Sequence, residues 1–180
     1  MGGLLVLNGS SRRDGVTAQC LQVVARRIAS EHGLDVDWVM IDDAIAGCRH
    51  CEVCVERCCQ KDQLQEIIEN MRVADRVLIG TPVYLDTPSS KVLAMLHRLT
   101  CMAEPTGRTF FAGKKAHLHA NGYVSGTKAA IQVMMGACEM LGFTIEGRST
   151  TEYIEKWNDW KIRGGLPGEG MYLPERTHRK

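Results

Sequence analysis

Long apolar runs and a strong excess of one charge are both missing from this 180-residue sequence. The longest apolar runs are far too short to span a bilayer, and no basic stretch followed by an apolar one opens the chain. We therefore expect a cytoplasmic protein with no membrane partner. The formal net charge of only +1 argues against nucleic acid as the main partner. The 44% of hydrophobic residues is typical of an ordinary globular domain.

Two familiar phosphate-binding motifs are also absent from the loop after the first apolar run. No Lys precedes Thr17, so residues 9–17 are not a GxxxxGK[ST] loop, and the GxGxxG fingerprint is missing. What the loop does contain is Gly, Ser and Arg between a predicted strand and a predicted helix. Helix N–H groups, hydroxyls and guanidinium groups together can hold an anion such as a terminal phosphate without magnesium. The alternative is a plain tight turn in which Thr17 is the helix N-cap.

Apolar periodicity predicts strands that alternate with helices along most of the chain. The predicted strands cover 4–8, 34–41, 74–80, 115–120 and 143–149, and helices cover 17–32 and the segments that begin near 62, 88 and 127. This order predicts an α/β fold of the flavodoxin-like, doubly wound type, with a five-stranded parallel sheet of order 2-1-3-4-5 in three α/β/α layers. One domain is expected over residues 1–150, with a Cys-rich insertion at 48–59. Residues 151–180 are expected to form a tail at a subunit interface, to which Trp157 and Trp160 contribute.

Three loops are predicted to meet at the carboxyl edge of this sheet, at residues 9–17, 81–86 and 121–126. In the second loop Pro82 fixes the backbone, and Tyr84 offers an aromatic wall unless it is simply buried at a strand end. Asn121, Gly122 and Tyr123 of the third loop are placed to close over a planar ring. Together the loops predict a site for a mononucleotide with a planar ring.

Eight cysteines are many for such a protein, and five of them lie between residues 48 and 59. In a reducing compartment a cluster this tight indicates metal binding or redox chemistry. Cys48, Cys51, Cys54 and Cys59 have the spacing C-x2-C-x2-C-x4-C, with Cys58 as an alternative fourth ligand. The compact run is similar to the spacing of cluster-binding ferredoxins, whereas structural zinc sites separate two ligand pairs by a longer loop. We expect a [4Fe–4S] cluster, with zinc or metal-free thiols as the alternatives.

Several other conspicuous side chains are expected to be structural. Cys20 and the Met-rich face of the helix after Gly126 are predicted to fill the core. His50 is expected to face solvent. His117 and His119 alternate along a strand and so share a face, where we expect a polar rim position rather than a metal pair.

Four stretches of the sequence resemble the NADPH-dependent FMN reductase family and, within it, the iron–sulfur flavoproteins. They are Gly9–Arg12 with Gly15–Thr17, the cysteine run before Lys61 and Asp62, Thr81–Tyr84, and the helix that contains Lys91, His97 and Arg98. The resemblance implies two sets of FMN contacts, to the phosphate from Ser10, Arg12, Val16 and Thr17, and to the isoalloxazine from Pro82, Val83, Tyr84 and Leu85.

The sequence departs from the family pattern at four positions. The family usually has Pro where this chain has Ser11, Asn or Ser at Val16, an aromatic residue at Leu85, and Asp at His97. A side-chain contact at Val16 is therefore lost, although a backbone contact survives, and ring stacking at Leu85 is weaker.

These features together predict an FMN-dependent oxidoreductase. It would pass electrons from NAD(P)H or another low-potential donor to an acceptor, through the cluster where one forms. The flavin supplies the electron chemistry, so no catalytic residue of the protein is nominated. The alternatives are a cluster-free NAD(P)H:FMN or quinone reductase, a non-enzymatic flavodoxin-type electron carrier, and a metal- or thiol-based sensor. A homodimer or homotetramer is expected, with a redox protein as a further partner.

Overall fold

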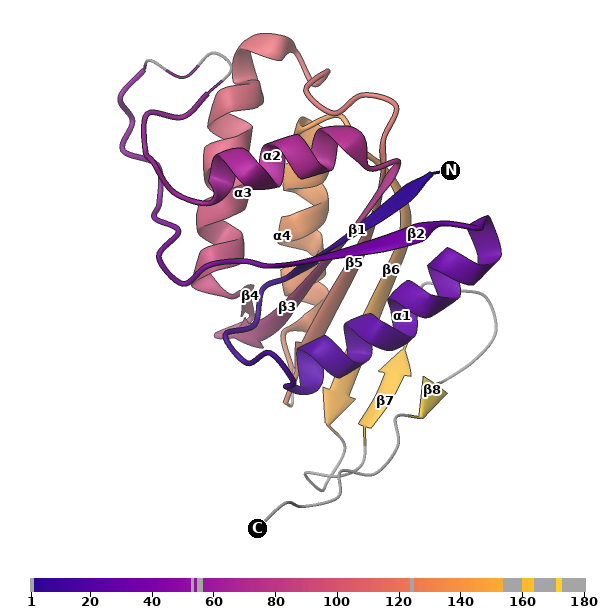
Figure 1. Cartoon of the computed structure of the whole chain (residues 1–180). Coiled ribbons are helices and arrows are strands. Elements are labelled where there is room, and N and C mark those ends of the chain that lie inside the picture. Colours follow the sequence, from indigo (N-terminus) through magenta and orange to yellow (C-terminus); the bar gives the residue numbers. More distant parts are fainter. Residues whose placement is uncertain are drawn as a thin grey trace.

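A sheet with helices on both faces forms the body of the molecule (Figure 1). The computed structural model describes residues 2–52, 54, 57–123, 125–153, 160–163 and 171–172. The strands are β1 (Gly3–Asn8), β2 (Asp35–Met40), β3 (Arg76–Tyr84), β4 (Thr87–Pro88), β5 (Lys115–Gly122), β6 (Thr144–Tyr153), β7 (Trp160–Arg163) and β8 (Met171–Tyr172). The helices are α1 (Val16–His32), α2 (Leu64–Val73), α3 (Ser90–Ala103) and α4 (Thr127–Met140), with a 3-10 turn at Glu104–Thr106.

The five long strands of the sheet run parallel in the order β2-β1-β3-β5-β6. When only parallel strands are counted, this order is 2-1-3-4-5, and the predicted flavodoxin-like class is confirmed. The antiparallel strands were not predicted. They are β4, which forms a hairpin with β3, and β7 and β8, which continue the sheet beyond β6.

Apolar side chains cover the two faces of the sheet unequally. The larger core lies under α2, α3 and α4, where Leu5, Leu7 and Val77 meet buried residues of those helices. The smaller core lies under α1, which packs Leu21, Val24 and Ile28 on Leu4 and Val6. Because neighbouring strand residues point to opposite faces, β1 supplies both cores. The result is the expected three-layer arrangement.

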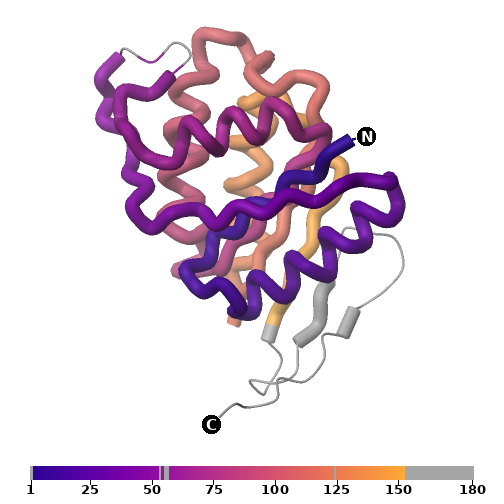
Figure 2. The backbone as a smooth tube through the Cα atoms, in the orientation of Figure 1, coloured from indigo at the N-terminus to yellow at the C-terminus, as the bar shows by residue number. Residues whose placement is uncertain are grey.

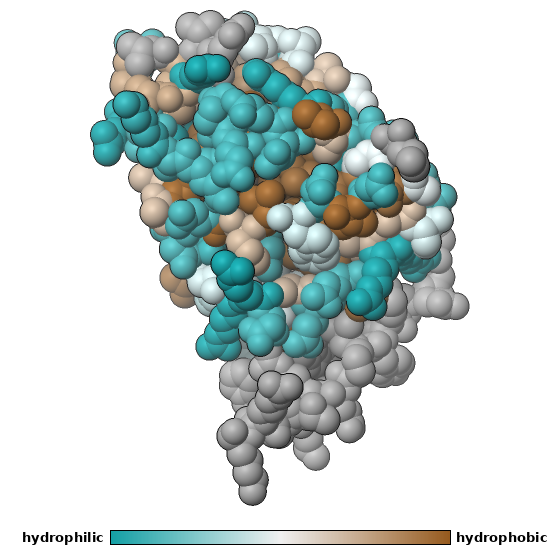
Figure 3. All heavy atoms as spheres, in the orientation of Figure 1, coloured by the Kyte–Doolittle hydropathy of each residue, from teal (hydrophilic) through white to brown (hydrophobic). Residues whose placement is uncertain are grey.

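The edge strand of the sheet, β2, lies at the surface between α1 and α2 (Figure 1). Figure 3 shows hydrophilic atoms over much of this side and a band of hydrophobic ones across its middle. Edge strand β2 is only partly covered, and Trp38 is 44% exposed. None of the described helices is both long and apolar enough to cross a membrane.

Most structural side chains lie where the sequence predicts. Cys20, Met134 and Cys138 are buried in the core, and His50 is exposed. The side chain of Trp160 and the whole of Trp157 lie outside the described residues, so their predicted subunit contact stays a prediction.

The expected rim position of His117 and His119 is wrong. Both rings are buried, although they share a face of β5 as predicted. His119 Nδ1 lies 2.8 Å from Ser149 Oγ, and His117 Nε2 lies 3.2 Å from Glu146 Oε2. The polar side chains of β6 therefore let β5 carry histidines inside the fold.

Candidate functional site

The three predicted loops do meet at the carboxyl edge of the sheet, and hydrogen bonds join them. The Thr17 hydroxyl donates to Asn121 Oδ1 at 2.6 Å, linking the first loop region to the third. The Ser89 hydroxyl, at the start of α3, donates to the Gly9 carbonyl at 2.8 Å. The Ser125 hydroxyl donates to Asp86 Oδ1 at 3.1 Å, linking the third loop to the β3–β4 hairpin. The edge is therefore one connected structure.

The first loop leads into a helix whose amino end has no side-chain cap. The N-cap of α1 is Gly15, and the first backbone bond of the helix runs from the Gln19 N–H to the Gly15 carbonyl at 3.1 Å. The alternative in which Thr17 caps the helix is wrong, because Thr17 lies inside α1 and its hydroxyl binds Asn121. The amino end of α1 thus directs backbone N–H groups and a partial positive charge toward the loop.

The predicted phosphate residues surround this helix end. Ser10 and Thr17 are buried, Val16 is half-buried and Arg12 is exposed. The Ser10 hydroxyl accepts the Arg12 N–H at 3.1 Å, which shapes the loop around the helix end.

The second loop is a tight hairpin between β3 and β4. Val83 pairs with Pro88 and Tyr84 with Thr87, so Leu85 and Asp86 form a two-residue turn. Both have positive φ, 51° and 60°, as a type I′ turn requires. A left-handed leucine is unusual and costs about 1–2 kcal/mol. Leu85 is nonetheless 98% exposed, and Tyr84 is 64% exposed, so the alternative of a buried Tyr84 is wrong.

The third loop packs closely on this hairpin. Gly126 has a φ of +85°, and a Cβ there would lie 2.3 Å from Asp86 Oδ1 and 2.9 Å from Val83 Cγ1. Only glycine fits this approach. Val83 is therefore turned toward the third loop. In that loop the side chain of Asn121 is buried, whereas Tyr123, two residues later, is 59% exposed.

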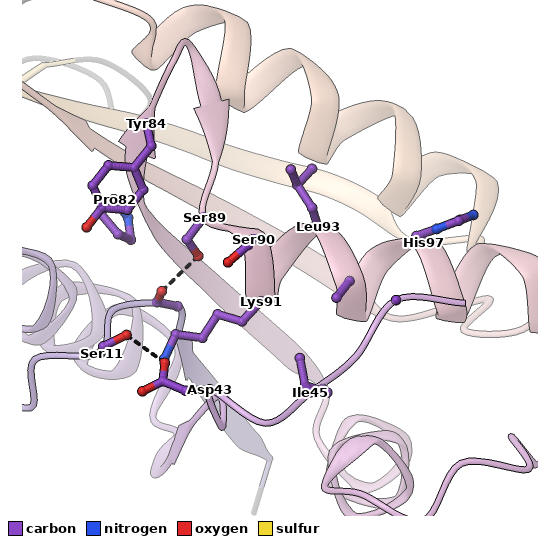
Figure 4. Close-up of a pocket in the computed structure, with 13 residues that line it drawn as sticks. Ser11, Asp43, Ile45, Pro82, Tyr84, Ser89, Ser90, Lys91, Leu93 and His97 are labelled. Carbon is purple, nitrogen blue, oxygen red and sulfur yellow. Dashed lines mark hydrogen bonds and ion pairs between the residues drawn. The ribbon is translucent and has the colours of Figure 1, made fainter. Parts of the chain in front are cut away.

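A pocket of about 790 Å³ opens on the other side of the hairpin (Figure 4). Pro82 and Tyr84 form one wall, and Leu93 and His97 lie along α3 at the far end. Gly9 and Ser11 bring the first loop to the same pocket, and Gly47 brings the start of the cysteine segment. The remaining lining residues are Asp43, Ile45, Ser89, Ser90, Lys91 and Ala94.

An ion pair in this pocket was missed by the sequence prediction. Lys91 Nζ lies 2.6 Å from Asp43 Oδ1 and donates to the Ile41 carbonyl at 2.8 Å. The Ser11 hydroxyl donates to the same carboxylate oxygen at 2.6 Å. Lys91 and Ser11 together lower the pKa of Asp43. The signal was a lysine on the apolar face of a predicted helix, because a buried ammonium group needs a partner of opposite charge.

The cysteine segment runs between β2 and α2, and Figure 2 shows it looping out beside α3. Cys51 Sγ lies 3.2 Å from Cys59 Sγ and 4.0 Å from Cys54 Sγ. Three of the four predicted ligands are therefore brought together. The thiol of Cys48 instead interacts with Cys101 of α3, and burial together with Cys48 raises the pKa of Cys101. In the described part of the chain, no three His, Cys, Asp or Glu side chains are already arranged as a metal site.

Cys58 differs from its neighbour Cys59, which is exposed. Cys58 packs against the larger core and lies beside the guanidinium of Arg98. Burial alone would raise the pKa of Cys58, but the Gln60 N–H and Arg98 outweigh burial and lower the pKa. Burial raises the pKa of Cys54 to about 11. The two adjacent cysteines thus face different surroundings.

Comparison with known proteins gives a family match over most of the chain. The model of the NADPH-dependent FMN reductase family matches residues 3–151. An iron–sulfur flavoprotein of Methanosarcina thermophila is 30% identical over 95 residues, which are 51% of this chain and 49% of that protein. An iron–sulfur flavoprotein of Archaeoglobus fulgidus is 31% identical over 97 residues, which are 53% of this chain and 47% of that protein. The chain spans about half the length of these curated relatives.

Solved structures share the fold at low sequence identity. RosB with a bound 8-demethyl-8-formylriboflavin-5′-phosphate intermediate has a TM-score of 0.67 at 19% identity, covering 89% of this chain and 68% of RosB. An NADH:FMN oxidoreductase in its apo form has a TM-score of 0.63 at 16% identity, covering 84% of this chain and 76% of the other.

Proposed function

The chain belongs to the NADPH-dependent FMN reductase family, and on this basis we propose that it is an FMN-dependent oxidoreductase. It takes electrons from NAD(P)H or another low-potential donor and delivers them to an acceptor. When bound, FMN supplies the electron-transfer chemistry, and the protein supplies position and electrostatics. The observation that carries the proposal is the hydrogen-bonded edge of three loops beside the uncapped amino end of α1.

The amino end of α1 fits an FMN phosphate. The N–H groups of its first turn and the Ser10 hydroxyl are donors that a dianion needs. The Thr17 hydroxyl, which donates to Asn121 in this structure, would turn to the phosphate when FMN binds. Arg12 is exposed at the same loop and adds a positive charge. In this proposal Val16 contributes through its backbone.

The two other loops fit the planar ring system of a flavin. Pro82 and Tyr84 line the pocket, whereas Val83 lies against the third loop. Leu85, Asn121, Gly122 and Tyr123 complete the proposed ring contacts. The exposed faces of Tyr84 and Tyr123 support this role, because large exposed aromatics at one edge are typical of binding surfaces.

The cysteine segment fits an iron–sulfur cluster by the chemistry of its donors. Cys51, Cys54 and Cys59 form a compact group of thiols, and Cys48 completes the proposed set. Thiolate sulfur is the ligand that such clusters use. The names of the relatives in Methanosarcina thermophila and Archaeoglobus fulgidus support the same proposal. When bound, the cluster would supply single-electron transfer to an acceptor. A homodimer or homotetramer and a redox protein partner belong to the same proposal.

The phosphate assignment is tested by changing Thr17. Thr17→Val keeps the shape of the side chain and removes its hydroxyl, so FMN is expected to bind about tenfold more weakly. Thr17→Ser restores the hydroxyl and should restore most of the affinity. The measurement is quenching of FMN fluorescence during titration of the apoprotein.

Thr109→Val is the matched control, because the Thr109 hydroxyl donates only to the nearby Thr106 carbonyl at 2.7 Å on an exposed turn. The control should keep the wild-type Kd. A Thr17→Val protein with the wild-type Kd would show that Thr17 does not hold the phosphate.

A further inference from the structure

Helix α3 carries two buried cations that bind the chain between β2 and α2, which contains the cysteine segment. Lys91 and Arg98 are seven residues apart and so lie on one face of the helix. Their side chains are only 6% and 1% exposed. Lys91 binds the chain just after β2, through Asp43 and the Ile41 carbonyl. Arg98 binds the chain farther along, on both sides of the cysteines.

Arg98 joins the two ends of the cysteine segment. Its Nη1 donates to the Ala46 carbonyl at 3.3 Å, just before the first cysteine, and to the carboxylate of Asp62, just after the last. Asp62 Oδ1 also accepts the Leu64 N–H at 3.2 Å, which ties this ion pair to the start of α2. One guanidinium nitrogen therefore closes the segment at its base.

The rest of the Arg98 guanidinium is buried on the side of the Cys58 sulfur. Nε and Nη2 have no hydrogen-bond partner among the residues that the structure describes, although the Cys58 sulfur lies beside the group. These two nitrogens carry three N–H bonds. A buried donor without an acceptor destabilises a fold, so such a group in a native structure needs an explanation. The sulfur-rich segment beside Arg98 offers acceptors.

We propose that Arg98 is the positioning residue of the cysteine segment, closing it through Nη1 and donating N–H···S hydrogen bonds from Nε and Nη2 to the sulfur of the bound cluster and its cysteines. The second part rests on the proposed function, which puts a cluster there. A cation and N–H donors beside a cluster favour the reduced state, which is more negative, and so raise the reduction potential. Arg98 acts through the sulfurs and needs no contact with substrate.

The first test is the reduction potential of the reconstituted protein. Arg98→Met removes the charge and all donors, and Arg98→Lys keeps the charge but loses the planar fork. We expect Arg98→Met to make cluster reduction about tenfold less favourable, a downward shift of about 59 mV for one electron, and Arg98→Lys to shift it less. Potentiometric titration followed by electron paramagnetic resonance measures this value without any turnover.

Arg72→Met is the matched control, because Arg72 lies in the last turn of α2, far along the helix from the end that the cysteine segment joins, and its guanidinium lies 5.4 Å from the Phe110 ring centroid. Its potential should equal that of the wild type. Unchanged potentials in both Arg98 variants, at wild-type iron content, would overturn the sulfur contact. Wild-type protein without iron and acid-labile sulfide after anaerobic reconstitution would instead overturn the proposed cluster.

The second test needs no cluster and covers variants that fail to load one. In the apoprotein, Arg98→Met should open the segment, so Cys54 and Cys58 should be alkylated by iodoacetamide at least tenfold faster than in the wild type. Mass spectrometry reads each site, with exposed Cys59 as the fast reference and buried Cys138 as the report of global unfolding. Unchanged rates at Cys54 and Cys58, with Cys138 protected, would overturn the closing role.

Discussion

At the scale of single residues, some polar side chains of this protein stabilise the fold and others line the candidate site. Thr17, Asn121 and Ser89 belong to both groups, because their hydrogen bonds join the loops that we propose to hold FMN. The sequence placed Ser10, Thr17 and Asn121 in loops at the carboxyl edge of the sheet, where the structure has them, and their contact with FMN stays a prediction. Asp43 and Lys91 were missed, because their pairing depends on β2 and α3 meeting in three dimensions.

His119 makes the stability of the fold depend on pH. Burial lowers the pKa of His119 to about 4, whereas an unfolded chain has about 6.5. The unfolded state therefore binds more protons between these values, and stability falls as the pH falls through this window. Between pH 7 and pH 5 this group alone removes about 2 kcal/mol of unfolding free energy. Burial lowers the pKa of His117 too, so the total loss is larger.

Urea unfolding at several pH values tests this effect. His119→Asn should flatten the dependence on pH between 7 and 5, whatever its own stability at pH 7. His97→Asn makes the same change on an exposed residue of α3 and should keep the wild-type slope. An equal slope in the His119 variant would show that another group causes the acid sensitivity.

At the scale of elements, loop conformation was the feature least visible in the sequence. The strands and helices were placed to within a few residues, because apolar periodicity reports burial directly. The hairpin β3–β4 was not predicted, since Leu85 and Asp86 lack the Asn-Gly or Gly residues that usually mark a type I′ turn.

The β3–β4 hairpin turn is expected to lower the stability of the apoprotein and to increase its affinity for FMN. Leu85→Asn places a residue that tolerates positive φ in the turn, so the apoprotein should gain about 1 kcal/mol of unfolding free energy. The same change removes an apolar side chain from the proposed flavin contacts, so FMN should bind more weakly. Chemical unfolding and FMN titration measure the two effects separately.

Val73→Asn is the control for Leu85→Asn, because Val73 is 85% exposed at the end of α2 and also loses an exposed apolar side chain. It should leave FMN affinity unchanged and bring no gain in stability. A Leu85→Asn protein less stable than the wild type would contradict a strained turn.

At the scale of the whole molecule, the fold was predictable because strands alternate with helices throughout residues 3–153. That alternation allows few topologies, and the loops at the carboxyl edge follow from it. Partners were less accessible to sequence reasoning, since they depend on surfaces assembled from distant segments. The segment of five cysteines shows the difference. The spacing of the cysteines predicted a cluster. The contacts of Arg98 with Ala46 and Asp62 could not be predicted, because they depend on how α3 packs against the cysteine segment.

The central claim is that this chain binds FMN and passes electrons through it. The most direct measurement is the absorption spectrum of anaerobic protein loaded with FMN and freed of excess, recorded before and after one equivalent of NADPH or NADH. The account predicts close to one bound flavin per chain and loss of its absorption near 450 nm with at least one of the two nucleotides. A chain that retains no flavin would contradict the claim, and a bound flavin that neither nucleotide reduces would exclude NAD(P)H as the electron donor.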